Sequence, residues 1–138
     1  MAKTISTVHP AATIREVVEI MKREDCGFVP ILRDDRLVGV VTDRDIMIRF
    51  CSDGASGRSL VTTPVSEIMT ATPCTVQADA SLEDAAHVMA IHQVRRLPVL
   101  DGTLLVGILS YGNLEQAFLA HGVYAEQATL GVAIGAEV

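Results

Sequence analysis

The sequence predicts a mixed α/β (α+β) fold of two similar units, each with the order β-α-β-β-α. The first observation is an internal repeat: residues 7–50 align without gaps on residues 75–118 at an offset of 68, with ten identities in 44 positions. The second is that hydrophobic spacing changes from helical to strand-like at the same places in both repeats. The third is size: a unit of about sixty residues buries too little surface to be secure alone, so we expect the two to pack sheet to sheet and share one core.

Each repeat is predicted to open with a short extended segment (residues 6–8 and 74–76) that leads into a capped helix. Capping-box patterns mark the start of each helix, and apolar residues follow at helical spacing. The capping pairs are Thr13 with Glu16 and Ser81 with Asp84. The apolar positions are Ile14, Val17, Val18 and Met21 in the first repeat, and Leu82, Ala85, Ala86 and Met89 in the second.

A hairpin and a second helix complete each predicted unit, because two short apolar runs flank a polar turn. In the first repeat the strands span 28–32 and 37–41, the turn 33–36 and the helix 44–51. In the second repeat the strands span 97–100 and 104–109, the turn 101–103 and the helix 113–121.

Domain boundaries follow from composition. Residues 52–59 read as a small polar linker, and residues 65–70 read as a short helix that leads into the second unit. We therefore expect a first unit with its linker at 1–60, a second unit at 61–122 and a tail at 123–138. For this apolar, weakly patterned tail the sequence leaves three alternatives open: an added helix, a cover for a core edge, or a disordered segment.

Bulk composition argues against several functional classes. The net charge of −6 lacks the basic excess typical of a general nucleic-acid binder. No apolar run approaches the roughly 18 residues of a membrane span, and no signal-peptide core follows the N-terminus, so we expect a cytoplasmic protein. Three cysteines without a CxxC pair argue against a disulfide framework and a structural zinc site.

The most informative polar pattern is Gly-x-x-Thr-x-x-Asp, formed by Gly39, Thr42 and Asp45. Thr42 is predicted at a strand exit next to a helix N-terminus, where free N–H groups favour anions. A carboxylate three residues later can accept hydrogen bonds from vicinal ribose hydroxyls. Ser110 and Asn113 occupy the same places in the second repeat. Helix capping by Thr42, Asp43 and Ser110 explains the same residues equally well from spacing alone.

Arg95 and Arg96 stand just before the predicted strand at 97–100. Their guanidinium groups suit bidentate phosphate recognition, although solvated or surface-paired arginines explain them as well. The first repeat has Gly27 and Phe28 at these places, so the two sites should differ. Further candidate cations are Arg44, Arg49 and Arg58.

Catalytic and metal-binding motifs do not occur. The four histidines form neither HxxxH nor HExxH, and the chain contains no GxSxG, Walker lysine motif or GxGxxG after a strand. We therefore expect no catalytic residues and no metal site. The lack of a recognisable nucleophile also argues against a nucleotide hydrolase.

These segments together resemble the cystathionine β-synthase (CBS) domain, and the tandem pair resembles a Bateman module of the stand-alone bacterial signal-transduction type. The segments that carry the resemblance are residues 26–31 (CGFVPI), 39–46 (GVVTDRDI), 65–70 (VSEIMT), 94–99 (VRRLPV) and 107–113 (GILSYGN). The resemblance covers about residues 4–121. It implies pseudo-twofold packing of the two sheets, two clefts for adenosine compounds, and homodimers that regulate another protein.

The resemblance also assigns roles to single residues. It implies that Asp45, and Asn113 in the second unit, hold the ribose, with Thr42 or Ser110 near ribose or phosphate. Residues matched to phosphate are Arg95 and Arg96, with Arg44 as a further ligand contact. Residues matched to the adenine are Thr7, Val8, Thr75 and Val76, with Val29 and Ile31 beside the ring. Asn113 stands where the family usually has an acidic residue, and Tyr111-Gly112 replaces Asp43-Arg44. Nucleotide binding is therefore expected more at the Thr42/Asp45 cleft than at the Ser110/Asn113 cleft.

The sequence thus predicts a regulatory sensor of an adenine nucleotide (AMP, ADP or ATP), an NAD-type dinucleotide or S-adenosylmethionine. We expect no catalysis of its own, no required cofactor, and a regulated partner protein that the sequence does not identify. The alternative is a ligand-free dimeric CBS scaffold that mediates protein–protein interaction.

Overall fold

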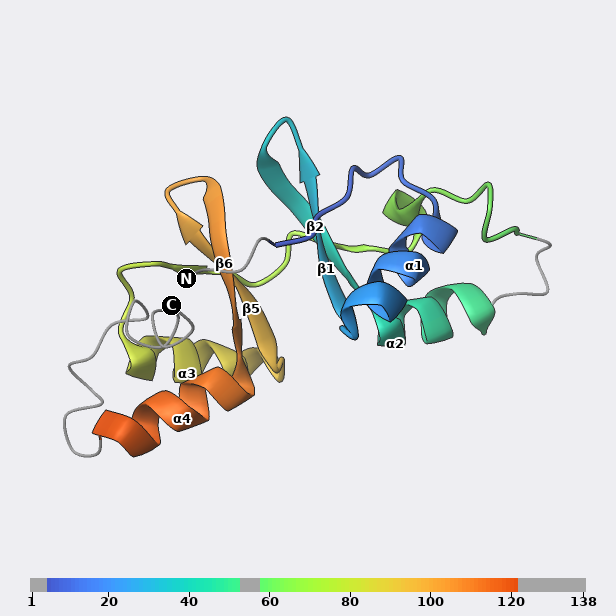
Figure 1. The fold of residues 1–138 in the computed structure, drawn as a ribbon. Coiled ribbons are helices and arrows are strands. Elements are labelled where there is room, and N and C mark those ends of the chain that lie inside the picture. The colour runs from blue at the N-terminus through green and yellow to red at the C-terminus, as the bar shows by residue number, and fades with distance from the viewer. Residues whose placement is uncertain (1–4, 53–57, 122–138) are drawn as a thin grey trace. The chain divides into compact units, whose positions relative to one another are not determined.

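Two units built from the two repeats make up the computed structural model, which describes residues 5–52 and 58–121 (Figure 1). Ser6–Pro73 forms the first unit, and the described residues from Cys74 onward belong to the second. The tail expected at 123–138 lies outside the described residues. Within the described part of the chain, no helix has both the length and the apolar character that a bilayer crossing requires.

The first unit contains a three-stranded antiparallel sheet in the order β1-β2-β3. Its helices are α1 (Ile14–Glu24), α2 (Asp43–Asp45), a π-helix (Ile46–Cys51) and a 3-10 helix (Val65–Glu67). Its strands are β1 (Phe28–Arg33), β2 (Arg36–Thr42) and β3 (Thr70–Ala71).

The second unit contains a sheet in the order β4-β5-β6, with β4 parallel to β5 and β6 antiparallel to it. Its elements are β4 (Val76–Gln77), α3 (Leu82–His92), β5 (Arg96–Asp101), β6 (Leu104–Ser110) and α4 (Tyr111–His121). The predicted mixed α/β class with two similar units is confirmed. In the first unit the opening strand is reduced to one parallel bridge between Val8 and Ile31.

The offset of 68 found in the sequence reappears in the strand register. Phe28 pairs with Thr42 in the first hairpin, and Arg96 pairs with Ser110 in the second. Both hairpins contain an irregularity at equivalent positions, after Ile31 and after Val99. Each hairpin therefore delivers its last residue to the same place, directly before a helix.

The predicted capping is confirmed for the first helix of each repeat, α1 and α3. Thr13 and Glu16 form a complete capping box, with hydrogen bonds of 3.2 and 3.0 Å. Ser81 accepts from the N–H of Asp84 at 3.0 Å, but the shorter Asp84 side chain does not return a hydrogen bond in the structure. The aspartate is thus a weaker substitute for the glutamate of the first repeat.

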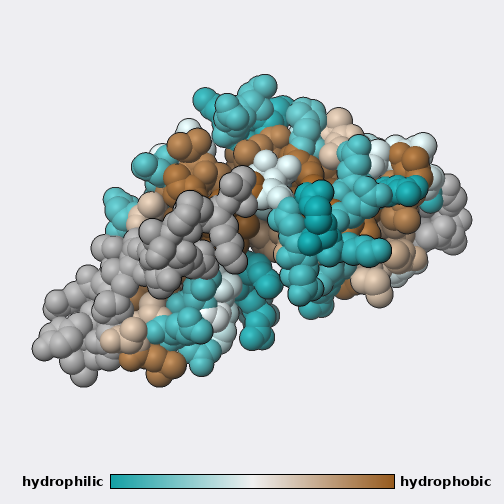
Figure 2. Space-filling view, viewed as in Figure 1, coloured by the Kyte–Doolittle hydropathy of each residue, from teal (hydrophilic) through white to brown (hydrophobic). Residues whose placement is uncertain are grey.

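Each unit has a hydrophobic cluster of its own. The buried face of α1 presents Ile14, Val17 and Met21, whereas Val18, expected on that face, is 37% exposed. The apolar stripe of the sequence is therefore wider than the face that the sheet covers. Hydrophobic residues are interspersed with hydrophilic ones on the surface drawn in Figure 2.

The boundary between the units differs from the one expected near residue 60. The N–H groups of Ile14 and Arg15 donate to the carbonyls of Thr63 and Leu60 at 3.0 and 3.1 Å. These bonds satisfy amides in the first turn of α1 that have no partner within the helix. Residues 65–71 then supply core side chains and strand β3, so this segment completes the first unit rather than beginning the second.

Gly39 permits the close approach of this segment to β2. A Cβ atom at position 39 would lie 2.7 Å from Met69 Sδ and 2.9 Å from the Thr70 carbonyl oxygen. We predict that Gly39→Ala destabilises the protein by about 1–3 kcal/mol, the usual cost of overpacking. Urea unfolding followed by circular dichroism would measure the loss.

Gly112→Ala is the matched control, because the nearest atom to its added Cβ is Ser110 Oγ at 3.9 Å. Position 112 lies in a helix, where alanine is better than glycine by up to about 1 kcal/mol, so stability should stay the same or rise. Equal losses in both variants would contradict the assigned role of Gly39.

Candidate functional site

The turn between β2 and α2 holds Thr42 and Asp45 in a reciprocal arrangement. Thr42 Oγ1 accepts from the Asp45 N–H at 3.1 Å, and Asp45 Oδ2 accepts from the Thr42 N–H at 2.9 Å. These bonds form a capping box, so the capping role that the sequence left open is present. Asp43, the first residue of α2, accepts from the Arg44 N–H at 2.8 Å, whereas the N-cap residue is Thr42.

Capping leaves part of this turn unused. Asp45 Oδ1 accepts no hydrogen bond from the described residues, and Arg49 Nε lies 3.8 Å from it. The Thr42 hydroxyl accepts a bond but donates none to the described residues. The Asp45 side chain is 13% exposed. Because capping uses only one of its oxygens, the other oxygen and the Thr42 hydroxyl proton can still form hydrogen bonds with a ligand.

The equivalent turn in the second unit has different spare chemistry. Ser110 Oγ accepts from the Asn113 N–H at 3.1 Å and donates its own proton to Asn113 Oδ1 at 2.7 Å. The Ser110 N–H also points to Asn113 Oδ1, at 3.4 Å, which requires an oxygen there. The side-chain groups left over are the N–H donors of the Asn113 amide, whereas the first unit retains an acceptor.

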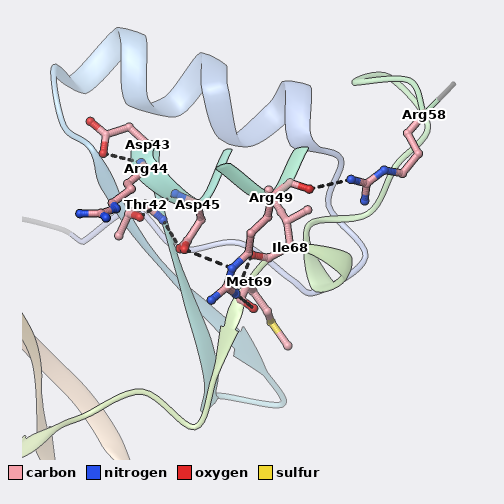
Figure 3. A network of polar contacts seen from close by, with 8 residues as sticks. All are labelled: Thr42, Asp43, Arg44, Asp45, Arg49, Arg58, Ile68 and Met69. Carbon is pink, nitrogen blue, oxygen red and sulfur yellow. Dashed lines mark hydrogen bonds and ion pairs between the residues drawn. The ribbon is translucent and has the colours of Figure 1, made fainter. Parts of the chain in front are cut away.

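Two of the three candidate cations of the first unit are engaged by backbone carbonyls (Figure 3). Arg49 donates to the carbonyls of Met69 and Ile68 at 3.0 and 3.4 Å, and Arg58 donates to the carbonyl of Arg49 at 2.6 Å. The exposed Arg44 guanidinium contacts no hydrogen-bonding partner among the described residues. Arg44 is therefore the available cation beside Thr42.

Arg95 and Arg96 are both exposed, as the surface alternative expected. No carboxylate of the described residues lies within ion-pair distance of either side chain, so surface pairing does not explain them. Arg96 faces Ser110 across the β5–β6 ladder. The Arg95 guanidinium lies 5.4 Å from the centre of the Tyr111 ring, and the Tyr111 N–H donates to the Arg95 carbonyl at 2.8 Å.

Arg95 also borders a pocket of about 460 Å³ within the second unit. Its lining residues are Ala86, Met89, Ala90, Gln93, Val94, Arg95, Tyr111 and Leu114. Sequence reasoning missed this pocket, because α3 and α4 contribute residues that no single periodic pattern connects. The presence of Tyr111 where the first unit has Asp43 was the available signal.

The residues assigned to the adenine occupy equivalent strand positions. Val8 pairs with Ile31 in the first unit, and Val76 pairs with Val99 in the second. Thr7, Val8 and Thr75 are half-buried, and Val76 is buried. Val29 and Ile31 have no exposed surface, because both belong to the core against α1. In this structure they support the strand rather than present a surface for a ring.

The segment before Thr7 is anchored at the end of α1. The Ser6 hydroxyl donates a hydrogen bond to the Glu24 carboxylate, and this bond, together with Arg23, holds the Glu24 pKa below its ordinary value.

The described residues contain no group of three or more metal-ligating side chains, and the three cysteines are free thiols.

Comparison with known proteins gives a consistent picture. A family model described as "CBS domain" matches residues 1–51 and 65–120. The CBS domain-containing protein YhcV of Bacillus subtilis is 41% identical over 114 residues, which span 83% of this chain and 79% of YhcV.

Two solved structures are also similar to this chain. CBSX2 in complex with AMP has a TM-score of 0.72 at 31% identity, covering 84% of this chain and 88% of that one. Hypoxic Response Protein I with two coordinated zinc ions, a protein of Mycobacterium tuberculosis, has a TM-score of 0.71 at 34% identity, covering 81% and 89%.

The capping geometry separates the structural and binding roles of Asp45. We predict that Asp45→Ala costs about 1 kcal/mol of unfolding free energy, because the Thr42 N–H loses its acceptor. Asp45→Asn keeps an amide oxygen for that N–H and should stay within about 0.5 kcal/mol of the parent protein. Urea unfolding of the three proteins would test this, and equal losses in both variants would show that charge, not capping, stabilises the turn.

Proposed function

The chain belongs to the CBS-domain family, and on that premise we propose that it is a regulatory module that binds an adenosine compound and has no catalysis of its own. The observation that supports this most is the carboxylate oxygen of Asp45 that helix capping leaves without a hydrogen bond, at a strand-to-helix turn and 3.8 Å from Arg49 Nε. An acceptor held in place by its neighbours, beside a free hydroxyl and the exposed Arg44, suits a ribose phosphate. A nucleoside with hydroxyl donors and an anionic group matches these three residues.

In this proposal Asp45 accepts from the ribose hydroxyls, Thr42 donates to ribose or phosphate, and Arg44 faces the phosphate. Thr7 and Val8 lie beside the adenine. AMP is the first ligand to test, because the similar CBSX2 structure holds it. ADP, ATP, an NAD-type dinucleotide and S-adenosylmethionine remain members of the proposed class.

The second unit is proposed as the weaker site. Asn113 spends its oxygen on Ser110 and offers N–H donors, which suit ribose oxygens less well than a carboxylate suits ribose hydroxyls. Arg95 and Arg96 would supply its phosphate contacts, with Thr75 and Val76 beside the base. We do not extend the proposal to Val29 and Ile31 as ring contacts, because both are fully buried.

The proposed mechanism is differential binding. A ligand that prefers one arrangement of a homodimer stabilises that arrangement by its difference in affinity, and a regulated partner protein recognises it. Three free thiols are in keeping with a reducing compartment, so the cytoplasm is the proposed location. We propose no nucleic-acid partner, since the net charge is −6.

A ligand-free scaffold is the second candidate, and the capping boxes favour it. Thr42 and Asp45 already satisfy each other's backbone amides, so the turn is complete without a ligand. Mass spectrometry of the supernatant after denaturing the purified protein discriminates the two functions. A stoichiometric nucleotide supports the sensor.

We predict that isothermal titration detects binding of at least one of AMP, ATP, NADH and S-adenosylmethionine. Asp45→Asn should then weaken that binding by about 1–3 kcal/mol, as expected when a buried hydrogen bond to a charged group is lost. This variant keeps the cap, so a loss of affinity reports on the ligand rather than on folding. Glu19→Gln, an exposed carboxylate paired with Arg15, is the matched control and should leave affinity unchanged.

The reverse substitution tests the proposed inequality of the sites. Asn113→Asp gives the second unit the carboxylate of the first, so it should strengthen binding there or raise the measured stoichiometry. The absence of heat with all four compounds from a folded protein would overturn the sensor function and leave the scaffold.

A further inference from the structure

Arg49 contacts two regions of the first unit that are distant in sequence (Figure 3). Its Nε lies 3.8 Å from Asp45 Oδ1, one helical turn earlier. Its Nη1 donates to the carbonyls of Met69 and Ile68, at 3.0 and 3.4 Å, twenty and nineteen residues later. One guanidinium group therefore connects the Asp45 carboxylate, the candidate ligand-binding group, to the backbone that follows the 3-10 helix.

The helix that carries Arg49 is wider than the one predicted. The expected helix at 44–51 is a single α-helical turn followed by a π-helix, Ile46–Cys51, with the Ser52 N–H donating to the Met47 carbonyl at 3.0 Å. π-helical segments are rare and frequently occur at functional sites. The Arg49 carbonyl in turn accepts from Arg58, whose guanidinium lies 5.3 Å from the Phe50 ring, so Arg49 is held from both sides.

The segment that Arg49 holds is the last part of the first unit before the chain continues at Cys74. Val65 and Ile68 anchor it in the core, with 0% and 1% exposure. Two of its amides, those of Ile68 and Met69, donate to the Val65 carbonyl at 3.0 and 2.9 Å. These hydrogen-bonded amides report on the order of the segment.

The second repeat has no counterpart of this connection. At the offset of 68, Asn113 replaces Asp45 and Ala117 replaces Arg49, and Ala117 is part of the core. A neutral amide and a methyl group form no ion pair. The connection is therefore specific to the unit that keeps the carboxylate acceptor.

We infer that Arg49 is a positioning residue that couples the state of the Asp45 carboxylate to the order of residues 65–71. A ligand hydroxyl bound to Asp45 Oδ1 would fix the carboxylate, and through Arg49 it would fix the backbone at Ile68 and Met69. Binding and segment order would then favour each other reciprocally. The ligand step rests on the proposed function, whereas the coupling itself is a property of the ligand-free protein.

A double-mutant cycle without ligand tests the coupling. Amide hydrogen exchange at Ile68 and Met69 is measured by NMR in the parent protein, Asp45→Asn, Arg49→Met and the double variant. We expect Asp45→Asn to speed exchange about twofold in the parent background, the size of effect typical of an i, i+4 ion pair, and to have no effect when Arg49 is already Met. An equal effect in both backgrounds, or none in either, would overturn the inference.

Two further variants separate positioning from a general loss of stability. Arg15→Met removes another i, i+4 ion pair from the same unit, Arg15–Glu19 at 3.2 Å, and should leave exchange at Ile68 and Met69 unchanged. Arg49→Lys keeps the charge but lacks the planar fork that reaches the carboxylate and the carbonyls together, so we expect partial rescue. Faster exchange at these amides in Arg15→Met, equal to that in Arg49→Met, would contradict the assignment.

The ligand arm adds saturating AMP to the parent protein and to Arg49→Met. We expect AMP to slow exchange at Ile68 and Met69 in the parent protein and not in Arg49→Met, while both proteins release heat on binding. Equal slowing in both would overturn the coupling even though the nucleotide binds. No heat with either protein would overturn AMP binding alone, since the ligand-free cycle decides the coupling independently.

Discussion

The reciprocal hydrogen bonds between a hydroxyl residue and an acid or amide three positions later organise this protein. A chain that leaves a strand and enters a helix exposes backbone N–H groups that no regular ladder satisfies. Thr42 with Asp45, and Ser110 with Asn113, satisfy these groups at the same point of each repeat. The hairpin register delivers the hydroxyl residue to this point, and the helix begins from it.

The proposed ligand binding depends on which hydrogen-bonding groups remain after the backbone amides of the turn are satisfied. A carboxylate has two oxygens and capping uses one, so the first unit retains an acceptor. An amide has one oxygen, and in the second unit both the N–H and the hydroxyl of Ser110 use it. One atom therefore distinguishes two turns that occupy equivalent places in the hairpin register, which is why helix capping and ligand recognition are compatible explanations of the same residues.

The repeat made the elements of each unit predictable from sequence. The features that could not be predicted depend on contacts between residues that are distant in the chain. Local spacing predicted the caps at Thr13 and Ser81 and the two hairpins, because those interactions join residues close in the chain. The docking of Leu60 and Thr63 on α1 joins residues about 45 to 50 positions apart, and no local pattern encodes it. The ring contact expected of Ile31 was inferred from family resemblance, whereas strand alternation turns that side chain into the core.

The same offset that makes the units alike also shows where they must behave differently. Thr42 and Ser110 correspond, but the cations beside them come from different places. Arg44 and Arg49 follow the turn in the first unit, whereas Arg95 and Arg96 lie at the start of the hairpin in the second. Arg49 reaches the backbone that leads toward Cys74, whereas Ala117 ends within its own core. Through Arg49, a change at the Asp45 carboxylate can therefore affect residues outside its own helix. The side chain of Ala117 provides no equivalent contact for a change at Asn113. Duplication produced two similar turns. The differences at positions 45/113 and 49/117 leave only the first turn with a carboxylate that contacts an arginine bound to a distant part of its unit.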